Sequence, residues 1–371
     1  MNPAIIPSLD PIPLPAPVWL LQVLSGLTFV LHVIPMNLVL GGGILAVVLA
    51  WLGRRSERAE YTRLAGHIAT VLPVAIALTI TMGVPPLLFL QVLYGPLFYT
   101  SSVLMAWPWL SVIGLLLVGY YGHYYFSLKK GNEGHPPIWV GFFASLAFLL
   151  IGFIYSNNMT LMIEPEKFGP MYREKMHGFM LNLGDPMLWP RYLHFLVGAI
   201  AVSALLVMVI GLVYRKESRY SAWAIQFGGL TFVVTTIVQF AVGIWQLLAL
   251  RRPVMLLFLG QDMAATLVFG AAFLLALVAI VLILVAALGK KPMGMTIAGI
   301  IAIAVTIILM TVMRAIIRDA YLGRNFVVSE QQVAPQWLVV AIFLVLLVGG
   351  LVLVGWMIHA VVTKRGLAEK G

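Results

Sequence analysis

Nine long apolar stretches, separated by short polar linkers, dominate this 371-residue chain. Each stretch has the roughly 20 residues that a helix needs to cross a bilayer. The linkers are rich in Arg, Lys, Gly and Asn, which are typical of helix ends. The pattern therefore predicts an all-α polytopic membrane protein with nine transmembrane helices. The predicted spans are 18–52, 64–92, 101–127, 137–158, 191–214, 221–249, 254–288, 294–321 and 335–362.

The composition excludes several classes of protein. With 62% hydrophobic and 10% charged residues, the chain is not an ordinary soluble domain. It has no cysteine, which excludes disulfides, thiolate metal sites, iron–sulfur clusters and covalently attached haem. The net charge of +10 lies in linkers between apolar spans, a pattern typical of membrane orientation. We therefore expect membrane lipid as a partner, no nucleic acid, and only a non-covalent haem.

The distribution of basic residues predicts an orientation. Fourteen of the 23 Lys and Arg residues fall in the linkers after spans one, three, five and seven and in the tail. Positive residues concentrate on the cytoplasmic side, so we expect the N-terminus outside and the C-terminus in the cytoplasm. The fourteen are Arg54, Arg55, Arg58, Arg63, Lys129, Lys130, Arg215, Lys216, Arg219, Lys290, Lys291, Lys364, Arg365 and Lys370.

The remaining segments complete the predicted organisation. Residues 1–17 form a Pro-rich extracytoplasmic arm without the basic start of a cleavable signal. Residues 18–362 form the membrane domain, and 363–371 a cytoplasmic tail. The longest connection, 158–190, is expected outside, where a polar loop of this length is often functional.

His194 is the most informative single residue. It lies one turn inside the predicted fifth span, and Arg191 precedes it by three positions on the same helical face. Ionisable groups at membrane depth are costly and are usually functional. A neutral imidazole beside a cation suits a haem, because the ring binds iron and the cation pairs with a propionate. The alternative is a histidine hydrogen-bonded at the level of the lipid headgroups.

Two further residues are candidate haem ligands. His32 lies about fourteen residues into the first span. The two interpretations of His32 are a haem iron ligand and a histidine that hydrogen-bonds a carbonyl of a neighbouring helix. Met263 lies near the outer end of the seventh span, at the predicted depth of His194, and a Met/His pair holds a low-spin haem. Chance placement is the alternative, since the chain has 18 methionines. The other histidines, expected to be solvated or to face a partner, are His67, His123, His135, His177 and His359.

The acidic residues argue against ion transport and oxygen reduction. None of the thirteen lies in the middle of a predicted span. Proton pumps and ion-coupled transporters usually place carboxylates at mid-membrane, as do oxidases that deliver protons to a buried oxygen site.

Five short segments, in this order, resemble the nine-span catalytic subunit (subunit I) of cytochrome bd quinol oxidases. They are LTFVLH at 27–32, MGVPP at 82–86, SNNM at 156–159, RYLH at 191–194 and GQDM at 260–263. The resemblance covers roughly residues 18–290 and is looser beyond. It implies a multi-pass protein of the bacterial cytoplasmic membrane.

The resemblance also implies a set of site residues. His194 and Met263 are the expected axial ligands of a low-spin haem b, and His32 the ligand of a second haem. Gln261 stands where the family has an arginine. For Arg314 and Arg318, the alternative is snorkelling at the end of a helix. The expected propionate partners are Arg191 and Arg251 or Arg252 at the first haem, and Arg314 and Arg318 at the second haem, held by His32.

The chain also departs from the family. Nothing acidic occurs in 101–132, where the family's third helix carries glutamates for proton delivery and for the haem d site. No glutamate in 313–321 matches the ligand on the family's eighth helix, and the long quinol-binding loop is reduced to residues 250–253. We therefore expect the low-spin haem site without oxygen reduction or the usual quinol loop.

These observations lead to one hypothesis and two rivals. The hypothesis is a haem b-containing membrane subunit that relays electrons between the quinone pool and an extracytoplasmic redox partner. A c-type cytochrome docking on residues 158–190 fits the partner's role, and a second membrane subunit is expected alongside. The rivals are a bd-type quinol:oxygen oxidase subunit and a haem-free transporter or scaffold with the same architecture.

Overall fold

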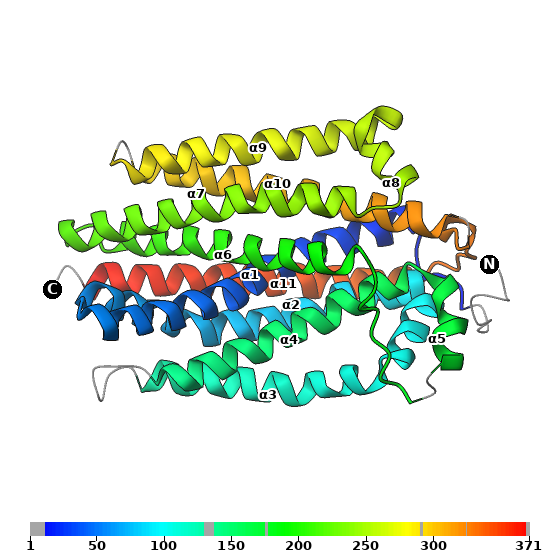
Figure 1. Cartoon of the computed structure of the whole chain (residues 1–371), viewed down its shortest axis with the longest axis horizontal. Helices are drawn as coiled ribbons and strands as arrows, with labels where there is room; N and C mark the ends of the chain where they lie inside the picture. The colour runs from blue at the N-terminus through cyan, green and yellow to red at the C-terminus, as the bar shows by residue number, and fades with distance from the viewer. Residues whose placement is uncertain (1–11, 130–136, 175–176, 290–291, 324, 369–371) are drawn as a thin grey trace.

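A bundle of long helices forms the molecule (Figure 1). The computed structural model describes residues 12–129, 137–174, 177–289, 292–323 and 325–368. Within these ranges the chain is helical, with one isolated β-bridge between Leu14 and Val333. The all-α fold class is therefore confirmed. Most of the predicted arm, together with His135 and the linker pair 290–291, lies outside the described residues.

The helices follow the apolar stretches closely. Their bounds are α1 Val18–Ser56, α2 Ala59–Leu104, α3 Ala106–Leu128, α4 Ile138–Met162, η1 Pro165–Lys167, α5 Phe168–Glu174, α6 Leu188–Val213, α7 Ser218–Leu248, α8 Arg252–Leu256, the π-turn η2 Leu257–Gln261, α9 Met263–Ala287, α10 Pro292–Leu322, η3 Val328–Glu330 and α11 Trp337–Ala368. The last helix thus continues through most of the segment expected to be a tail.

Eight of the described helices are long and apolar enough to cross a membrane. They correspond to all the predicted spans except the third. That span forms α3, whose 23 residues include two tryptophans, four tyrosines and a histidine that lower its hydropathy. The protein is therefore a multi-pass membrane protein, and its ninth crossing stays a prediction.

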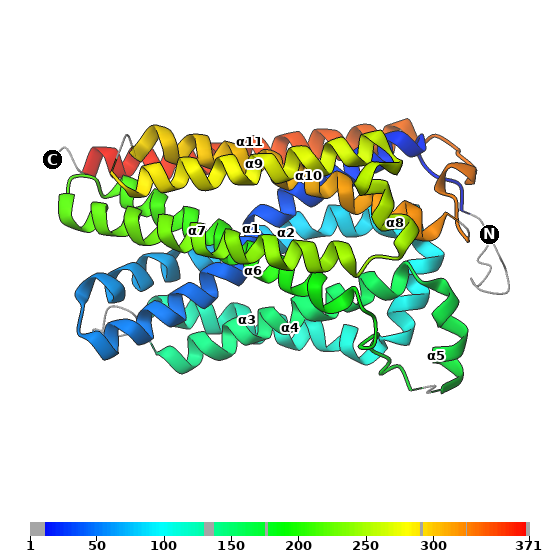
Figure 2. The same cartoon turned by 45° about the horizontal axis from the view of Figure 1, so that its top comes forward.

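The two ends of the bundle differ in character. At one end lie the connections α1–α2 and α6–α7, which we call the basic end for its arginines and lysines (Figure 1). At the opposite end lie α5, α8 and residues 163–187, which we call the long-loop end (Figures 1 and 2). Helix α1 begins at the long-loop end and α11 ends at the basic end (Figure 1). Which end faces the cytoplasm stays a prediction.

Two elements differ from the sequence-based expectation. Helix α2 continues to Leu104 through four prolines and has a kink at Tyr94, where φ is −130°, two residues before the last of them, Pro96. The span predicted at 254–288 is broken instead into α8, η2 and α9. Gly260, with φ of +110°, makes the break, and the Asp262 side chain then caps α9 by accepting from the backbone N–H of Ala265 at 2.7 Å.

Helix α6 is held tightly against α1. A Cβ at Gly41 would lie 2.1 Å from the carbonyl oxygen of Ala199, so only glycine permits this approach. Nearby, the Ser203 hydroxyl donates to the carbonyl of Asn37 at 3.0 Å. This contact fixes the position of α6, which carries His194.

Candidate functional site

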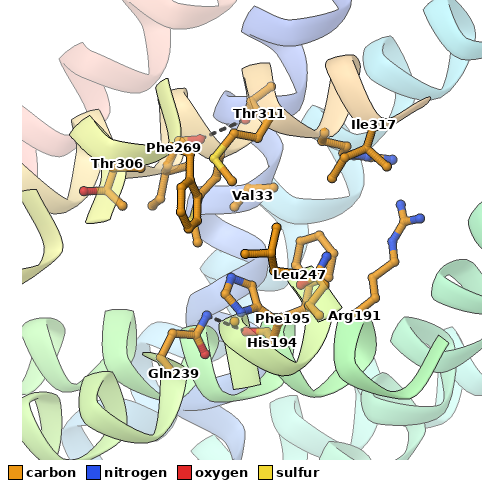
Figure 3. Close-up of a pocket in the computed structure, with 18 of the residues that line it drawn as sticks. Val33, Arg191, His194, Phe195, Gln239, Leu247, Phe269, Thr306, Thr311 and Ile317 are labelled. Carbon is orange, nitrogen blue, oxygen red and sulfur yellow. Dashed lines mark hydrogen bonds between the residues drawn. The ribbon is translucent and has the colours of Figure 1, made fainter. Parts of the chain in front are cut away.

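An apolar cavity of about 300 Å³ lies between α1, α6, α7, α9 and α10, toward the long-loop end. Its volume is within the range of small-molecule and cofactor sites. Figure 3 shows His194 and Arg191 reaching from α6 into this space, with Phe269, Thr306 and Ile317 on the opposite side. We call it the His194 cavity.

The His194 side chain has no hydrogen bond among the described residues, and its Nδ1 atom is fully buried. The ring packs against Gly243 of α7, where an added Cβ would lie 3.3 Å from Cε1 of His194. One turn earlier on α7, the Gln239 amide donates to the backbone carbonyl of His194 at 2.9 Å, as Figure 3 shows. The backbone of His194 is thus fixed while its imidazole stays available to a ligand.

Two arginines in the cavity form no ion pair with a carboxylate among the described residues. Arg191 of α6 is buried, and the Asp185 carboxylate is near enough to attract its charge without pairing with it. Arg314 of α10 lies over the face of Phe29, at 4.1 Å from the ring centroid. Arg318, at the rim, differs because it pairs with Asp319 at 3.1 Å and lies 4.2 Å above the ring of Tyr94. A buried charge without a partner is costly, so Arg191 and Arg314 make the cavity strongly attractive to an anion.

This donor set fits a haem. The group needs a neutral imidazole for its iron, an apolar enclosure for its macrocycle and cations for its two propionates. The cavity offers an imidazole without a hydrogen bond, a largely apolar wall and two unpaired guanidinium groups. Among the described residues no three His, Asp or Glu side chains gather into a site for a bare metal ion. A haem does not need one, because its porphyrin supplies four of the iron ligands.

The structure does not bring Met263 together with His194. Met263 is the first residue of α9, immediately after the Asp262 cap, and is 72% exposed outside the cavity lining. Gln261 is exposed beside it. The prediction that Met263 faces His194 is therefore not supported, because the break at Gly260 turns this segment away from the bundle.

Arg251 and Arg252 also lie outside the cavity lining. Arg252 is exposed at the start of α8. Arg251 forms ion pairs with Glu164, at 2.9 Å, and with Glu166, and it lies 4.7 Å above the ring of Tyr321. The carboxylates of the long loop thus pair with Arg251, which we expected to pair with a haem propionate.

His32 lies apart from the His194 cavity, between α1 and α2. Its Nδ1 is 3.0 Å from the carbonyl oxygen of Thr79, and the ring packs against Gly83. Because a carbonyl only accepts, Nδ1 carries the proton and Nε2 is left without one. The contact expected for a structural histidine is therefore present. It also leaves the ring in the tautomer that iron-binding histidines use.

Two histidines that we expected to be solvated are not. His123 is 0% exposed, stacked near Phe148 and 3.4 Å from the Ser145 hydroxyl, because α3 packs this face against α4. His67 is half-buried, hydrogen-bonded to Tyr220 at 3.0 Å and stacked on Tyr214. The positions of these two histidines near predicted helix ends did not indicate their aromatic and hydroxyl neighbours.

The long loop closes the end of the bundle through a compact charged network. Lys167 is 2.5 Å from Glu164 and 2.9 Å from Asp185. Burial and a hydrogen bond with Asp185 raise the pKa of Glu164. Burial opposes ionisation of Asp185, but hydrogen bonds with Glu164 and Lys167 outweigh it and lower the pKa of Asp185. One proton shared between the two carboxyls, facing one ammonium, accounts for both directions.

Sequence reasoning missed two residues of the site and did not foresee the second surroundings of a third. Gln239 and Gly243 are one turn apart on α7 and support His194, and the polar Gln239 inside an apolar span was the available signal. Arg314, expected to serve a second haem near His32, lines the His194 cavity and is also near enough to His32 for its charge to act on that ring. No sequence signal places one helix against another at this level of detail.

The comparisons with known proteins agree with the fold. No family model and no curated protein matches the sequence. The solved structure of bd oxidase from Geobacillus thermodenitrificans matches with a TM-score of 0.73 and 14% identity, covering 95% of this chain and 100% of the other. The chain therefore has a bd-oxidase-like fold, and an identity this low shows the fold alone.

Proposed function

We propose that this chain is a haem b-binding respiratory membrane subunit that relays electrons between the quinone pool and an extracytoplasmic redox partner. The observation that carries the proposal is the His194 cavity, where one imidazole without a hydrogen bond and two unpaired arginines face an apolar space. The likeness in fold to a bd oxidase supports a respiratory role. A haem b supplies reversible one-electron transfer when bound.

The residues of the cavity have distinct proposed roles. His194 holds the iron, and Gln239 fixes the backbone from which the ring projects. Arg191 and Arg314 bind the two propionates, which would be expensive to bury without cations. The apolar side chains of α7, α9 and α10 exclude water, which strengthens these ion pairs and lowers the cost of reorganising solvent during electron transfer.

The proposed partners follow from the position of the site. The cavity lies toward the long-loop end, so a partner docked on residues 163–187 comes close to the haem edge. The proposed partner at this surface is a c-type cytochrome. A quinone in the surrounding lipid and a second membrane subunit complete the proposed complex in the bacterial cytoplasmic membrane. His32, with its unprotonated Nε2, is the proposed ligand of a second haem.

Haem content and spectra of the purified protein test this proposal. We expect a b-type band in the reduced-minus-oxidised spectrum and at least one haem per chain by pyridine haemochrome. His194→Ala is expected to lose the low-spin band. His67→Ala, whose imidazole is held by Tyr220 and Tyr214, is the matched control and is expected to keep it. A colourless wild-type protein would favour a haem-free transporter or scaffold, and oxygen uptake with quinol would favour an oxidase.

A further inference from the structure

The wall of the His194 cavity opposite α6 is formed in part by α10. The two helices run in opposite directions, since α6 begins at the long-loop end and α10 ends there (Figures 1 and 2). Arg191 and Arg314 face each other closely enough for their positive charges to repel. The two guanidinium groups therefore lie near each other in the cavity.

One turn deeper than this pair, each helix presents a possible iron ligand. His194 follows Arg191 by three residues and so lies about 4.5 Å deeper along α6. Met310 precedes Arg314 by four residues and so lies about 6 Å deeper along α10, on the same helical face. Both residues line the cavity. The imidazole and the thioether thus stand at matching depth on facing walls.

The other methionines of the cavity are engaged elsewhere. Met159, Met162 and Met187 are buried in the hydrophobic core at the long-loop end, and Met313 packs against that core. Of the five methionines that line the cavity, Met310 alone belongs to none of the described hydrophobic clusters. A flexible, polarizable side chain that fills no core gap is free to act as a ligand.

We propose that Met310 would supply the second protein ligand of the haem iron, together with His194, in the role that the sequence suggested for Met263. The assignment rests on the proposed function. A Met/His pair makes the iron low-spin and raises its reduction potential relative to bis-histidine ligation. The haem would then bridge α6 and α10, with its propionates toward Arg191 and Arg314.

Purified full-length Met310→Leu tests the assignment, with Met313→Leu and Met263→Leu as matched controls. Leucine conserves volume, so folding is expected to survive. We expect Met310→Leu to keep its haem through His194 but to lose the methionine–ferric haem charge-transfer band and to become high-spin by electron paramagnetic resonance. Both controls are expected to keep the wild-type spectrum. Met310→His is expected to restore a low-spin signal at a lower reduction potential.

Failure of the ligand assignment and failure of the proposed function give different results. Haem with an unchanged low-spin spectrum in Met310→Leu overturns the ligand assignment and leaves the proposed function standing. Loss of the charge-transfer band in Met263→Leu instead transfers the role to Met263 and also overturns the assignment. A wild-type protein without haem overturns the proposed function, and the ligand assignment with it.

Discussion

The arginines at the two ends of the bundle differ in whether a carboxylate pairs with them. At the basic end, Arg63 holds the Glu217 carboxylate with both terminal nitrogens, one at 2.6 Å, and lies 4.2 Å above the ring of Tyr220. In the His194 cavity, Arg191 and Arg314 form no ion pair among the described residues, although they are more deeply buried, and only Arg191 has a carboxylate, that of Asp185, near enough to attract its charge.

The difference distinguishes an arginine with a structural role, Arg63, from arginines that are suited to bind a ligand, Arg191 and Arg314. A buried charge that lacks a partner destabilises a fold, whereas a surface ion pair contributes little. The charge of Arg63 is neutralised by Glu217, so Arg63 needs no ligand. Arg191 and Arg314 carry a cost that the polypeptide does not offset, and an anionic ligand in the cavity would offset it.

Removing a cavity arginine should weaken haem binding and stabilise the apo-protein. Truncating one partner of a buried charge pair costs about 2–5 kcal/mol, so Arg191→Met or Arg314→Met should lower haem affinity roughly 30-fold or more. Without haem, the same variants should melt at a higher temperature, because an uncompensated charge is gone. Haem titration and thermal unfolding of both forms measure the two effects.

The control is Arg63→Met at the basic end. Its side chain is 37% exposed, so its loss should destabilise both forms by about 1 kcal/mol or less and leave haem affinity unchanged. A lower melting temperature of the Arg314→Met apo-protein would contradict the contrast, since it would mean that the protein already compensates this charge.

Lys167→Met should loosen the long-loop end. It leaves Asp185 without its cation and Glu164 with Arg251 alone, and breaking a buried pair is strongly destabilising. Since Lys167 is 33% exposed, we expect a reduced loss of about 1–2 kcal/mol, with faster proteolysis in 163–187. Lys129→Met, which removes only a contact with Tyr125, should change neither readout.

The pH dependence of this end should come mainly from Asp185. Its lowered pKa means that its stabilisation is present above the ordinary value of 3.8 and is lost as the pH falls through the folded value. Glu164, with a raised pKa, acts in the opposite sense and loses its stabilisation as the pH rises through its folded value. Asp185→Asn should lower stability at neutral pH and flatten the acid limb of unfolding curves. Glu330→Gln, outside the network, should leave the limb in place.

Gly243→Ala should disturb the ring of His194 without removing it. The new Cβ would lie 3.3 Å from Cε1, and an off-rotamer side chain costs roughly 0.5–1.5 kcal/mol. We expect bound haem with an altered electron paramagnetic resonance spectrum. Gly270→Ala on α9, where nothing lies within 4 Å, is the control and should leave the spectrum unchanged. An unaltered Gly243→Ala spectrum would argue that His194 is not the iron ligand.

The sequence predicted most of the helices because apolar length is a local property. Eight predicted spans correspond to helices apolar enough to cross a membrane, most of them within a few residues at each end. The errors arose where backbone geometry overrides hydropathy. Helix α2 continues past four prolines and is non-helical only at Tyr94, and Gly260 breaks the seventh predicted span beside its polar residues Gln261 and Asp262.

The candidate site was only partly predictable. The spacing of Arg191 and His194 places both on one face of one helix, so the amino-acid order alone predicts one wall of the cavity. It also predicts a membrane protein, and the lack of cysteine excludes a covalently attached haem. Only the tertiary structure placed Arg314 and Met310 opposite them and left Met263 exposed. The physical reason is that hydropathy fixes how far a helix runs but not its rotation or depth against its neighbours. Close contacts such as Gly41 against Ala199 set those, and they exist only once the helices have packed.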